Sequence, residues 1–451
     1  MSKMRQNYEK QMPLSTGWPD HDLSRELRVI SEILDSHPGI YDKALVDITQ
    51  GKRADRGARG MSGEQAIRCG ILKRMHGLSY DKLSFHLADS ESFKEFARIG
   101  YRKKMRRSTL QDNISKVTPE TWEQINRVII THAKGCNIEK GRKVRGDCTV
   151  VETHIHKPHD SGQLLDCVRV VTRTLVKLNQ GVRSITFTFQ DHRRRARKRY
   201  YSIVNTTKAN DRKKAYSDLL HVAEKTYTYG IKALEAARDI SIEDGKIGEY
   251  ITKLGETLEL MGSVIEQTKR RVFRGEKVPA GEKVVSIFEP HTDIIVKKDG
   301  EALFGHKVAL MVGKSSMILD CMILKGNPGD ESLAIELVER QEDMWGRVPR
   351  QIAFDGKFAS KHNLMTLKDM GVKDVSFSKK RGMKISEMVK SSWVYKQLHR
   401  FRAGVEGCIS TLKRVFNLSR CDWRGMEAFE SYVWSGVVTY NLVVLARHML
   451  D

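Results

Sequence analysis

Residues 144–155 read Val-Arg-Gly-Asp-Cys-Thr-Val-Val-Glu-Thr-His-Ile, and at this point the pattern of the chain changes. The stretch is rich in β-branched residues and alternates apolar with polar ones, which is typical of a strand. Further segments of this kind follow at 284–288, 293–297, 307–312, 317–324, 351–354 and 374–377. Because helical patterns at 331–345 and 361–370 alternate with the later strands, the sequence predicts an α/β fold with a mixed sheet and flanking helices.

The 140 residues before this sheet are predicted to form an all-α module. Ser62, Ser79 and Thr118 each precede an apolar helical pattern, and Ser108 with Gln111 gives a capping-box signal. A cationic loop lies beside that last helix start, with Arg102, Lys103, Lys104, Arg106 and Arg107. Cations and free backbone amides at a helix start can hold a DNA phosphate, although a solvated loop has the same composition.

A helical insertion is predicted between the first two strands, at about 163–275. Apolar residues recur every three or four positions at 216–234 and again at 247–265, so two arms should pack as an antiparallel hairpin. Near its base lie six cations, Arg193, Arg194, Arg195, Arg197, Lys198 and Arg199. Repulsion between these cations should keep the segment extended or solvated unless an anion is bound. The favoured anion is the DNA backbone. The alternative is that the segment is simply a solvated helical face. The expected domains are therefore 1–140, 141–162 with 276–451, and the insertion.

Composition points to a nucleic-acid partner. The chain has 451 residues, and its 79 lysines and arginines against 56 acidic residues give a net charge of +23. The seven cysteines contain no C-x-x-C pair, which argues against a disulfide framework or a zinc ribbon. The most apolar stretch, 433–450, is interrupted by Asn441 and Arg447 and is predicted to be a buried C-terminal helix rather than a membrane span. We expect a cytoplasmic protein with no membrane partner.

Two aspartates occupy places where a sheet can build a site. Asp355 directly follows the apolar strand 351–354 and precedes a glycine, and ligands of open α/β sheets bind at the carboxyl ends of strands. The alternative is that the Asp-Gly pair only forms a turn and has no functional role. Asp147 lies within the first strand, where aspartate is disfavoured, so either metal ligation or a water-facing edge position is needed to explain it.

Glu406 is the third candidate acid. On a helix predicted over 397–416, His399, Arg402, Glu406 and Lys413 fall on one stripe, with an apolar seam on the other side. An ordinary amphipathic helix explains this pattern as well. A metal-ligating carboxylate flanked by cations that contact phosphate also fits it, because carboxylates suit magnesium and two such ions support phosphodiester cleavage.

The spacing Arg402-x3-Glu406-x6-Lys413 resembles the arginine, glutamate and lysine signature of bacterial insertion-sequence DDE transposases. The blocks at 146–161 and 354–360 resemble the first- and second-aspartate blocks of these enzymes. Those at 286–293, 304–306 and 326–330 are similar to blocks of the ISNCY-like group, so that the resemblance covers most of the chain from about residue 60. His399 departs from the usual tyrosine, and Lys357 from a common glycine.

This resemblance implies a ribonuclease-H-like catalytic domain in which Asp147, Asp355 and Glu406 are the catalytic residues and metal ligands. It implies two Mg²⁺ ions, for which Mn²⁺ should substitute, and cleavage and strand transfer at the inverted repeats of double-stranded DNA. The active form is expected to be a homodimer or a higher oligomer on DNA, associated with the bacterial nucleoid.

Three alternatives remain open from the residues alone. His154, His156 and His159 could form a zinc site, although polar residues beside the active strand are the more ordinary explanation. A DNA-binding relative that has lost catalysis is a second alternative, against which the presence of all three acids argues. A nuclease that cuts without joining is the third, since it would use the same acids.

Overall fold

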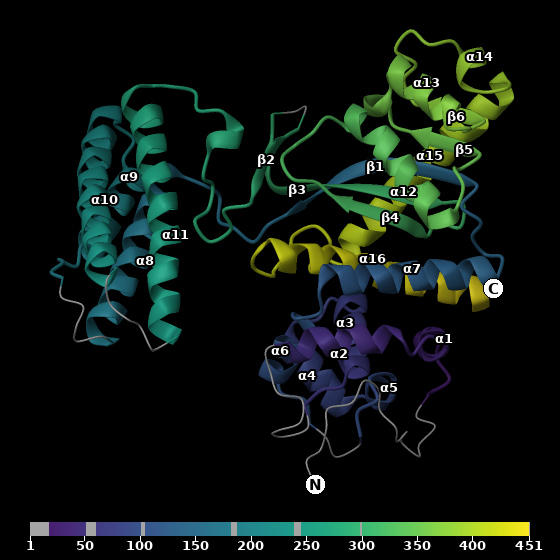
Figure 1. Ribbon diagram of the computed structural model, residues 1–451, viewed down its shortest axis with the longest axis horizontal. Helices are drawn as coiled ribbons and strands as arrows, with labels where there is room; N and C mark the ends of the chain where they lie inside the picture. The colour runs from purple at the N-terminus through teal and green to yellow at the C-terminus, as the bar shows by residue number, and fades with distance from the viewer. Residues whose placement is uncertain are drawn as a thin grey trace. The chain divides into compact units, whose positions relative to one another are not determined.

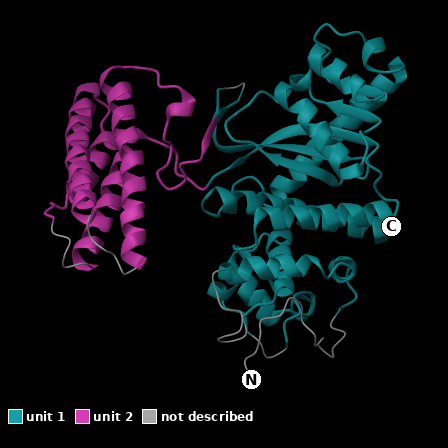
Figure 2. Ribbon diagram, viewed as in Figure 1, with its two compact units in different colours: residues 1–153, 295–451 teal, residues 154–294 magenta. Residues whose placement is uncertain are grey.

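The computed structural model describes residues 18–50, 60–100, 104–181, 187–238, 245–297 and 300–450 (Figure 1). Contacts divide the chain into two compact units, one formed by 1–153 with 295–451 and the other by 154–294 (Figure 2). The second unit therefore begins earlier and ends later than the insertion expected at 163–275. The N-terminal helices belong to the same unit as the sheet, because they pack on helices that cover it.

Six strands form one mixed sheet. They are β1 (Lys143–Glu152), β2 (Asp293–Val296), β3 (Ala302–Gly313), β4 (Ile318–Ile323), β5 (Gln351–Phe354) and β6 (Asp374–Phe377). The order is β2-β3-β1-β5-β6, and β4 also pairs with β3. Strand β1 is antiparallel to β3 and parallel to β5, and β5 is parallel to β6. The α/β fold with a mixed sheet, predicted from the alternating segments, is thus what the chain adopts.

One predicted strand is absent. Residues 284–288 form turns, because the Ser286 hydroxyl accepts hydrogen bonds from the backbone N–H groups of Phe288 and Glu289. A serine that bonds its own following backbone in this way offers those groups an alternative to a strand ladder. The strands at β5 and β6, in contrast, have the predicted limits.

The register of the three parallel strands sets the ends of their mutual pairing level, although β1 itself continues to Glu152 beside β3. The last residue pairs are Gly146 with Phe354 between β1 and β5, and Phe354 with Phe377 between β5 and β6. The next residues along the three strands are Asp147, Asp355 and Ser378. Gly146 permits this close arrangement, since a Cβ there would lie 2.4 Å from the Phe354 ring. Two carboxylates and a hydroxyl therefore emerge at one edge of the sheet.

Helices cover both faces of the sheet. A 3-10 turn (Asp330–Leu333) leads into α12 (Ala334–Trp345), whose Arg340 pairs with Asp320 of β4 at 2.6 Å. Helix α13 (Lys361–Asp369) follows the turn Gly356–Phe358, and Ser360 caps this helix as predicted. The short α14 (Ile385–Met388) precedes α15 (Ser392–Arg414), which packs on β1, β5 and β6. Strand alternation places Asp320 and Asp147 on opposite faces, so α12 and α15 lie on opposite sides of the sheet.

The N-terminal helices are α1 (Asp22–Asp35), α2 (Ile40–Thr49), α3 (Gly63–Met75), α4 (Tyr80–Asp89), α5 (Glu91–Phe96), α6 (Arg107–Ile114) and α7 (Pro119–Gly135). Ser62, Ser79 and Thr118 cap their helices as predicted. The predicted capping box at Ser108 is wrong, because Ser108 lies inside α6. The helix begins at Arg107, and its N-cap residue Arg106 makes no side-chain capping bond.

The C-terminal helix α16 (Met426–Leu450) lies beside α7 (Figure 1) and is largely buried, as its apolar sequence predicts. Its Asn441 is fully buried and explains the polar interruption. The Asn441 side chain accepts from the N–H of Ile318 at 2.8 Å and donates to the carbonyl of Ile318 at 2.7 Å, which satisfies the edge of β4. No helix among the described residues is long and apolar enough to cross a membrane.

The second unit is built from α8 (Asp160–Gly181), α9 (Arg193–Asn205), α10 (Ala209–Ala237) and α11 (Gly245–Thr268), with a π-helical turn at Lys269–Phe273. The two predicted arms are α10 and α11, which pack on each other, and α8 packs on both. Leu254, Leu258 and Met261 of the predicted apolar stripe lie in a core of their own. This unit therefore buries its own apolar surface.

Candidate active site

All three candidate acids meet one guanidinium group. Arg402 Nη1 lies 3.4 Å from Asp147 Oδ2 and 3.4 Å from Asp355 Oδ1, while Arg402 Nη2 pairs with Glu406 one helical turn further on. The two aspartate oxygens are therefore no further apart than twice that distance. Arg402 is 15% exposed and Glu406 63% exposed, so the cluster opens to solvent on the side of Glu406. Asp147 comes from within β1, Asp355 from the end of β5, and Arg402 and Glu406 from the late helix α15.

The position of α15 on the sheet depends on Arg145, which lies two residues before Asp147 in β1. The buried Arg145 guanidinium donates to the carbonyl of Phe401 at 2.9 Å and to Ser316 Oγ at 3.0 Å. It passes directly over Gly404, where an added Cβ would lie 2.0 Å from Arg145 Nη1. Glycine at 404 therefore lets the helix that carries Arg402 and Glu406 approach β1 closely.

Asp355 is held as a carboxylate by hydrogen bonds. Partial burial would raise its pKa, but the Ser378 hydroxyl, which donates to Asp355 Oδ1 at 2.9 Å, and the N–H groups of Gly356 and Lys357 outweigh this and lower the pKa. Ser378 Oγ also accepts from the N–H of Gly356 at 2.7 Å, so that one hydroxyl fixes both the carboxylate and the turn behind it.

Asp147 is in a different electrostatic environment. Burial above all, together with the charges of Asp355 and Asp330, raises the pKa of Asp147 to about 6, although a hydrogen bond from the N–H of Cys148 and the attraction of Arg402 oppose this shift. One guanidinium thus faces three carboxyl groups. Carboxylate oxygens suit hard divalent cations such as Mg²⁺, and such ions would balance the negative charge that Arg402 leaves uncompensated. Among the described residues, no group of three or more His, Cys, Asp or Glu side chains is arranged as a metal site, and Arg402 lies where the acids meet.

If the acids perform the DNA cleavage that the resemblance implies, Ser378→Ala should slow it without unfolding the protein. The substitution removes a hydrogen bond to a charged carboxylate and leaves the N–H of Gly356 without its acceptor, a loss of about 1.5–3 kcal/mol that corresponds to roughly 10- to 100-fold in rate. The rate of DNA cleavage and the melting temperature should be measured for Ser378→Ala and for Ser378→Thr, which keeps the hydroxyl. An unchanged rate for the alanine variant would show that Asp355 needs no such support.

The remaining cations predicted on α15 are not part of this cluster. His399 is exposed, and its ring lies 6.2 Å from that of Tyr395. Lys413 is partly buried beside Glu152, at the far end of β1. Its burial lowers its pKa, and the nearby positive charge of Lys297 lowers the pKa further. Of the three cations predicted on this stripe, Arg402 is the one that contacts the acids among the described residues.

The cationic loop of the N-terminal module is partly described. Arg102 and Lys103 lie outside the described residues, while Lys104, Arg106 and Arg107 are exposed. Arg107 pairs with Asp81 at 3.3 Å, and both line a surface cavity of about 640 Å³ together with Gln111 and Arg424. The cations are thus available at the surface of the helical module.

The cationic segment at 193–199 is helical and largely exposed, which agrees with the alternative of a solvated helical face. It forms the first turns of α9, and three of its six cations pair with two acidic side chains. Arg193 pairs with Asp191, and both Arg195 and Arg199 pair with Asp218 of α10. Among the described residues no ion pair involves the other three cations, Arg194, Arg197 and Lys198.

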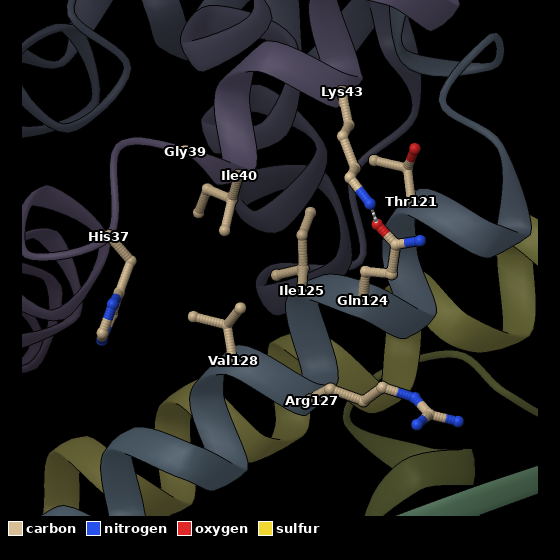
Figure 3. Close-up of a pocket in the computed structure, with 9 residues that line it drawn as sticks. All are labelled: His37, Gly39, Ile40, Lys43, Thr121, Gln124, Ile125, Arg127 and Val128. Atoms are coloured by element: carbon tan, nitrogen blue, oxygen red, sulfur yellow. Dashed lines mark hydrogen bonds between the residues drawn. The ribbon is translucent and has the colours of Figure 1, made fainter.

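A separate cavity of about 440 Å³ lies between α2 and α7 (Figure 3). Ile40, Ile125 and Val128 form its apolar part, and Lys43 donates to Gln124 across one side of it. None of the three acids lines this cavity, so it has no direct part in their chemistry.

Comparison with known protein families gives one match. Residues 285–442 match the family described as the transposase DDE domain. The matched region includes Asp355, Arg402 and Glu406 and stops short of Asp147, and it spans less than half of the chain. No curated protein and no solved structure matches the chain. The mixed sheet with helices on both faces is the ribonuclease-H-like fold that a transposase DDE domain has.

Proposed function

We propose that this protein is a DNA transposase in which Asp147, Asp355 and Glu406 form the catalytic site. The observation that carries the proposal is the meeting of these three acids at Arg402, although Asp147 lies more than 200 residues before the other two in sequence. The transposase DDE domain match supports it, and so does the net charge of +23, which suits a DNA partner.

The chemistry assigned to the site is phosphodiester cleavage followed by strand transfer. Two divalent cations, Mg²⁺ with Mn²⁺ as a substitute, would activate the attacking oxygen and stabilise the leaving one when bound. Asp147 and Asp355, side by side at the strand ends, and Glu406 opposite them would hold these ions. Arg402, released from the acids, is suited to contact a DNA phosphate through its planar fork of N–H donors.

The rest of the chain is assigned to DNA binding and assembly. The N-terminal helical module, with Lys104, Arg106 and Arg107 at its surface, and the helical unit that carries α9 would both contact the backbone of the element ends. Binding of two ends calls for a homodimer or a higher oligomer on DNA. An insertion-sequence origin in a bacterium, in the ISNCY-like group, is the finer assignment that the block pattern at 286–293 and 326–330 supports.

The deciding experiment is cleavage and joining of DNA that carries the sequences flanking this reading frame. Purified protein with Mg²⁺ should produce strand breaks at the element ends and joined products with a target plasmid, and it should produce neither in EDTA. Breaks without joined products would identify a nuclease. Binding without breaks would identify a relative that has lost catalysis.

The cations of α9 give a prediction with an internal control. Replacing Arg194, Arg197 and Lys198 by alanine should weaken binding to all DNA sequences about equally and reduce the salt dependence of the binding constant, because each lost phosphate contact removes about one unit of slope. Replacing Arg195 and Arg199 should have a smaller effect for each residue replaced, since both already pair with Asp218, which offsets part of their charge. The affinities should be titrated against salt for both variants. Equal effects, or a change in base preference, would contradict this role.

A further inference from the structure

A fourth acid, Asp330, lies behind the candidate active site. It is 7% exposed and follows the turn at 325–329, most of which is exposed. Asp330 directly precedes the helix predicted at 331–345, but the N-cap residues of the 3-10 turn and of α12 are Gly329 and Leu333. Asp330 Oδ1 instead accepts from Lys307 Nζ at 2.9 Å, and Lys307 Nζ also donates to the carbonyl of Pro328 at 2.5 Å. The turn is thereby fixed to β3.

The other oxygen of Asp330 faces the turn that carries Asp355. Asp330 Oδ2 lies 4.0 Å from Lys357 Nζ, and the N–H of Lys357 donates to Asp355 Oδ2 at 3.4 Å. The same two turns are joined a second time by Asn363, whose side-chain amide donates to the carbonyls of Glu331 and Phe358. Asp330 therefore connects Lys307 on β3 with the residue two positions after Asp355.

Asp147 remains paired with Leu310 of β3, but the pairing that joins β1 to β5 does not reach the turn that carries Asp355. The pairing of β1 with β5 ends at Gly146 and Phe354, one residue before each aspartate. Lys307 pairs with Val150, so its side chain and Asp330 lie on the face opposite to Asp147 and α15. Arg402 thus contacts the two aspartates from one face, and Asp330 supports the Asp355 turn from the other.

Burying such an ion pair is expensive, and an apolar pair of similar size would usually stabilise a protein equally well. Both side chains are nevertheless almost fully withdrawn from solvent, at 12% exposure for Lys307 and 5% for Asp330. An ionic contact beside an acid cluster is therefore better explained by what it positions than by the stability that it adds.

We propose that Asp330 is a positioning residue of the active site, which is anchored by Lys307 and holds the Asp355–Lys357 turn in register with Asp147. It acts through these neighbours and not on the DNA. The inference rests on the proposed function, because it is the relative placement of Asp147 and Asp355 that the pair maintains.

Four variants separate positioning from stability: Asp330→Asn, Lys307→Met, the double variant Lys307→Met/Asp330→Leu, and Lys357→Ala. Lys307→Met should have the lowest melting temperature because it leaves a buried carboxylate unpaired, and the double variant should recover it. Cleavage by Asp330→Asn and by the double variant should stay at least about tenfold below wild type in kcat, with KM for DNA unchanged, because small misplacements of reacting groups are costly. Lys357→Ala should lose less, since Lys307 still anchors Asp330.

Calorimetry with Ca²⁺ supplies a readout that does not depend on turnover. Asp330→Asn should bind Ca²⁺ about tenfold more weakly than wild type if the two aspartates are no longer in register. Recovery of both melting temperature and kcat in the double variant would overturn the proposal, as would wild-type Ca²⁺ affinity in Asp330→Asn. A wild-type protein that neither cleaves DNA nor binds Ca²⁺ would instead overturn the proposed function, and the inference with it.

Discussion

Asp355→Asn is expected to reduce DNA cleavage by about 10³-fold or more while the protein remains folded and bound to DNA. The substitution keeps the shape of the side chain and removes the negative charge that a divalent cation requires, and loss of a principal electrostatic stabiliser has an effect of this size. Asp147→Asn and Glu406→Gln should behave in the same way. The melting temperature of Asp147→Asn without added metal should not fall, since burial and neighbouring charges already disfavour the Asp147 carboxylate, whereas Asp355→Asn should lower it slightly because hydrogen bonds stabilise the Asp355 carboxylate.

Cleavage should be measured with Mg²⁺ and with Mn²⁺, and DNA binding in parallel. Asp369→Asn is the matched control, because Asp369 is an exposed aspartate at the end of α13 and should tolerate the change. Full cleavage by any one of the three variants would remove that acid from the site. Joint loss of cleavage, binding and melting temperature would indicate misfolding and would not support a catalytic role.

The placement of Asp355 could be predicted from the sequence because it depends on local pattern. A short apolar strand followed by Asp-Gly identifies both the strand and the carboxylate at its end, and the strand limits at 351–354 agree with the structure. Ser378 occupies the equivalent position after β6 and was not identified. The same signal was available, since it follows the predicted strand 374–377, but a serine after a strand is commonplace, whereas two aspartates are not.

Features that depend on distant partners could not be predicted. Arg195 and Arg199 of α9 both pair with Asp218 on the next helix, which the local sequence does not indicate. The buried partner of Asp330, Lys307, lies 23 residues away on β3. Gly404 is unremarkable in a sequence, and its role is apparent only when Arg145 is seen to pass over it. Local rules such as charge repulsion and helix capping carry no information about these tertiary contacts.

Arg402→Ala is the second substitution from which we expect a large effect. In the absence of metal, Arg402 is the one cation that contacts all three acids, as far as the described residues show. Without it, three carboxyl groups face one another with no counter-ion, so the melting temperature in EDTA should fall. Added Mg²⁺ should raise the melting temperature of the variant more than that of the wild type, because the ions then bind without displacing a guanidinium.

Cleavage by Arg402→Ala should fall by about 100-fold, since a positioned cation beside a reacting phosphate has effects of that order. Arg402→Lys keeps the charge but cannot bridge three carboxylates with a planar fork of donors, so its cleavage rate and metal response should be intermediate. Arg400→Ala, an exposed arginine two residues away on α15, is the control for lost charge alone. If Arg402→Ala and Arg400→Ala respond alike to EDTA and to Mg²⁺, Arg402 does not compete with metal for the acids, and its contact with them has no part in assembling the site.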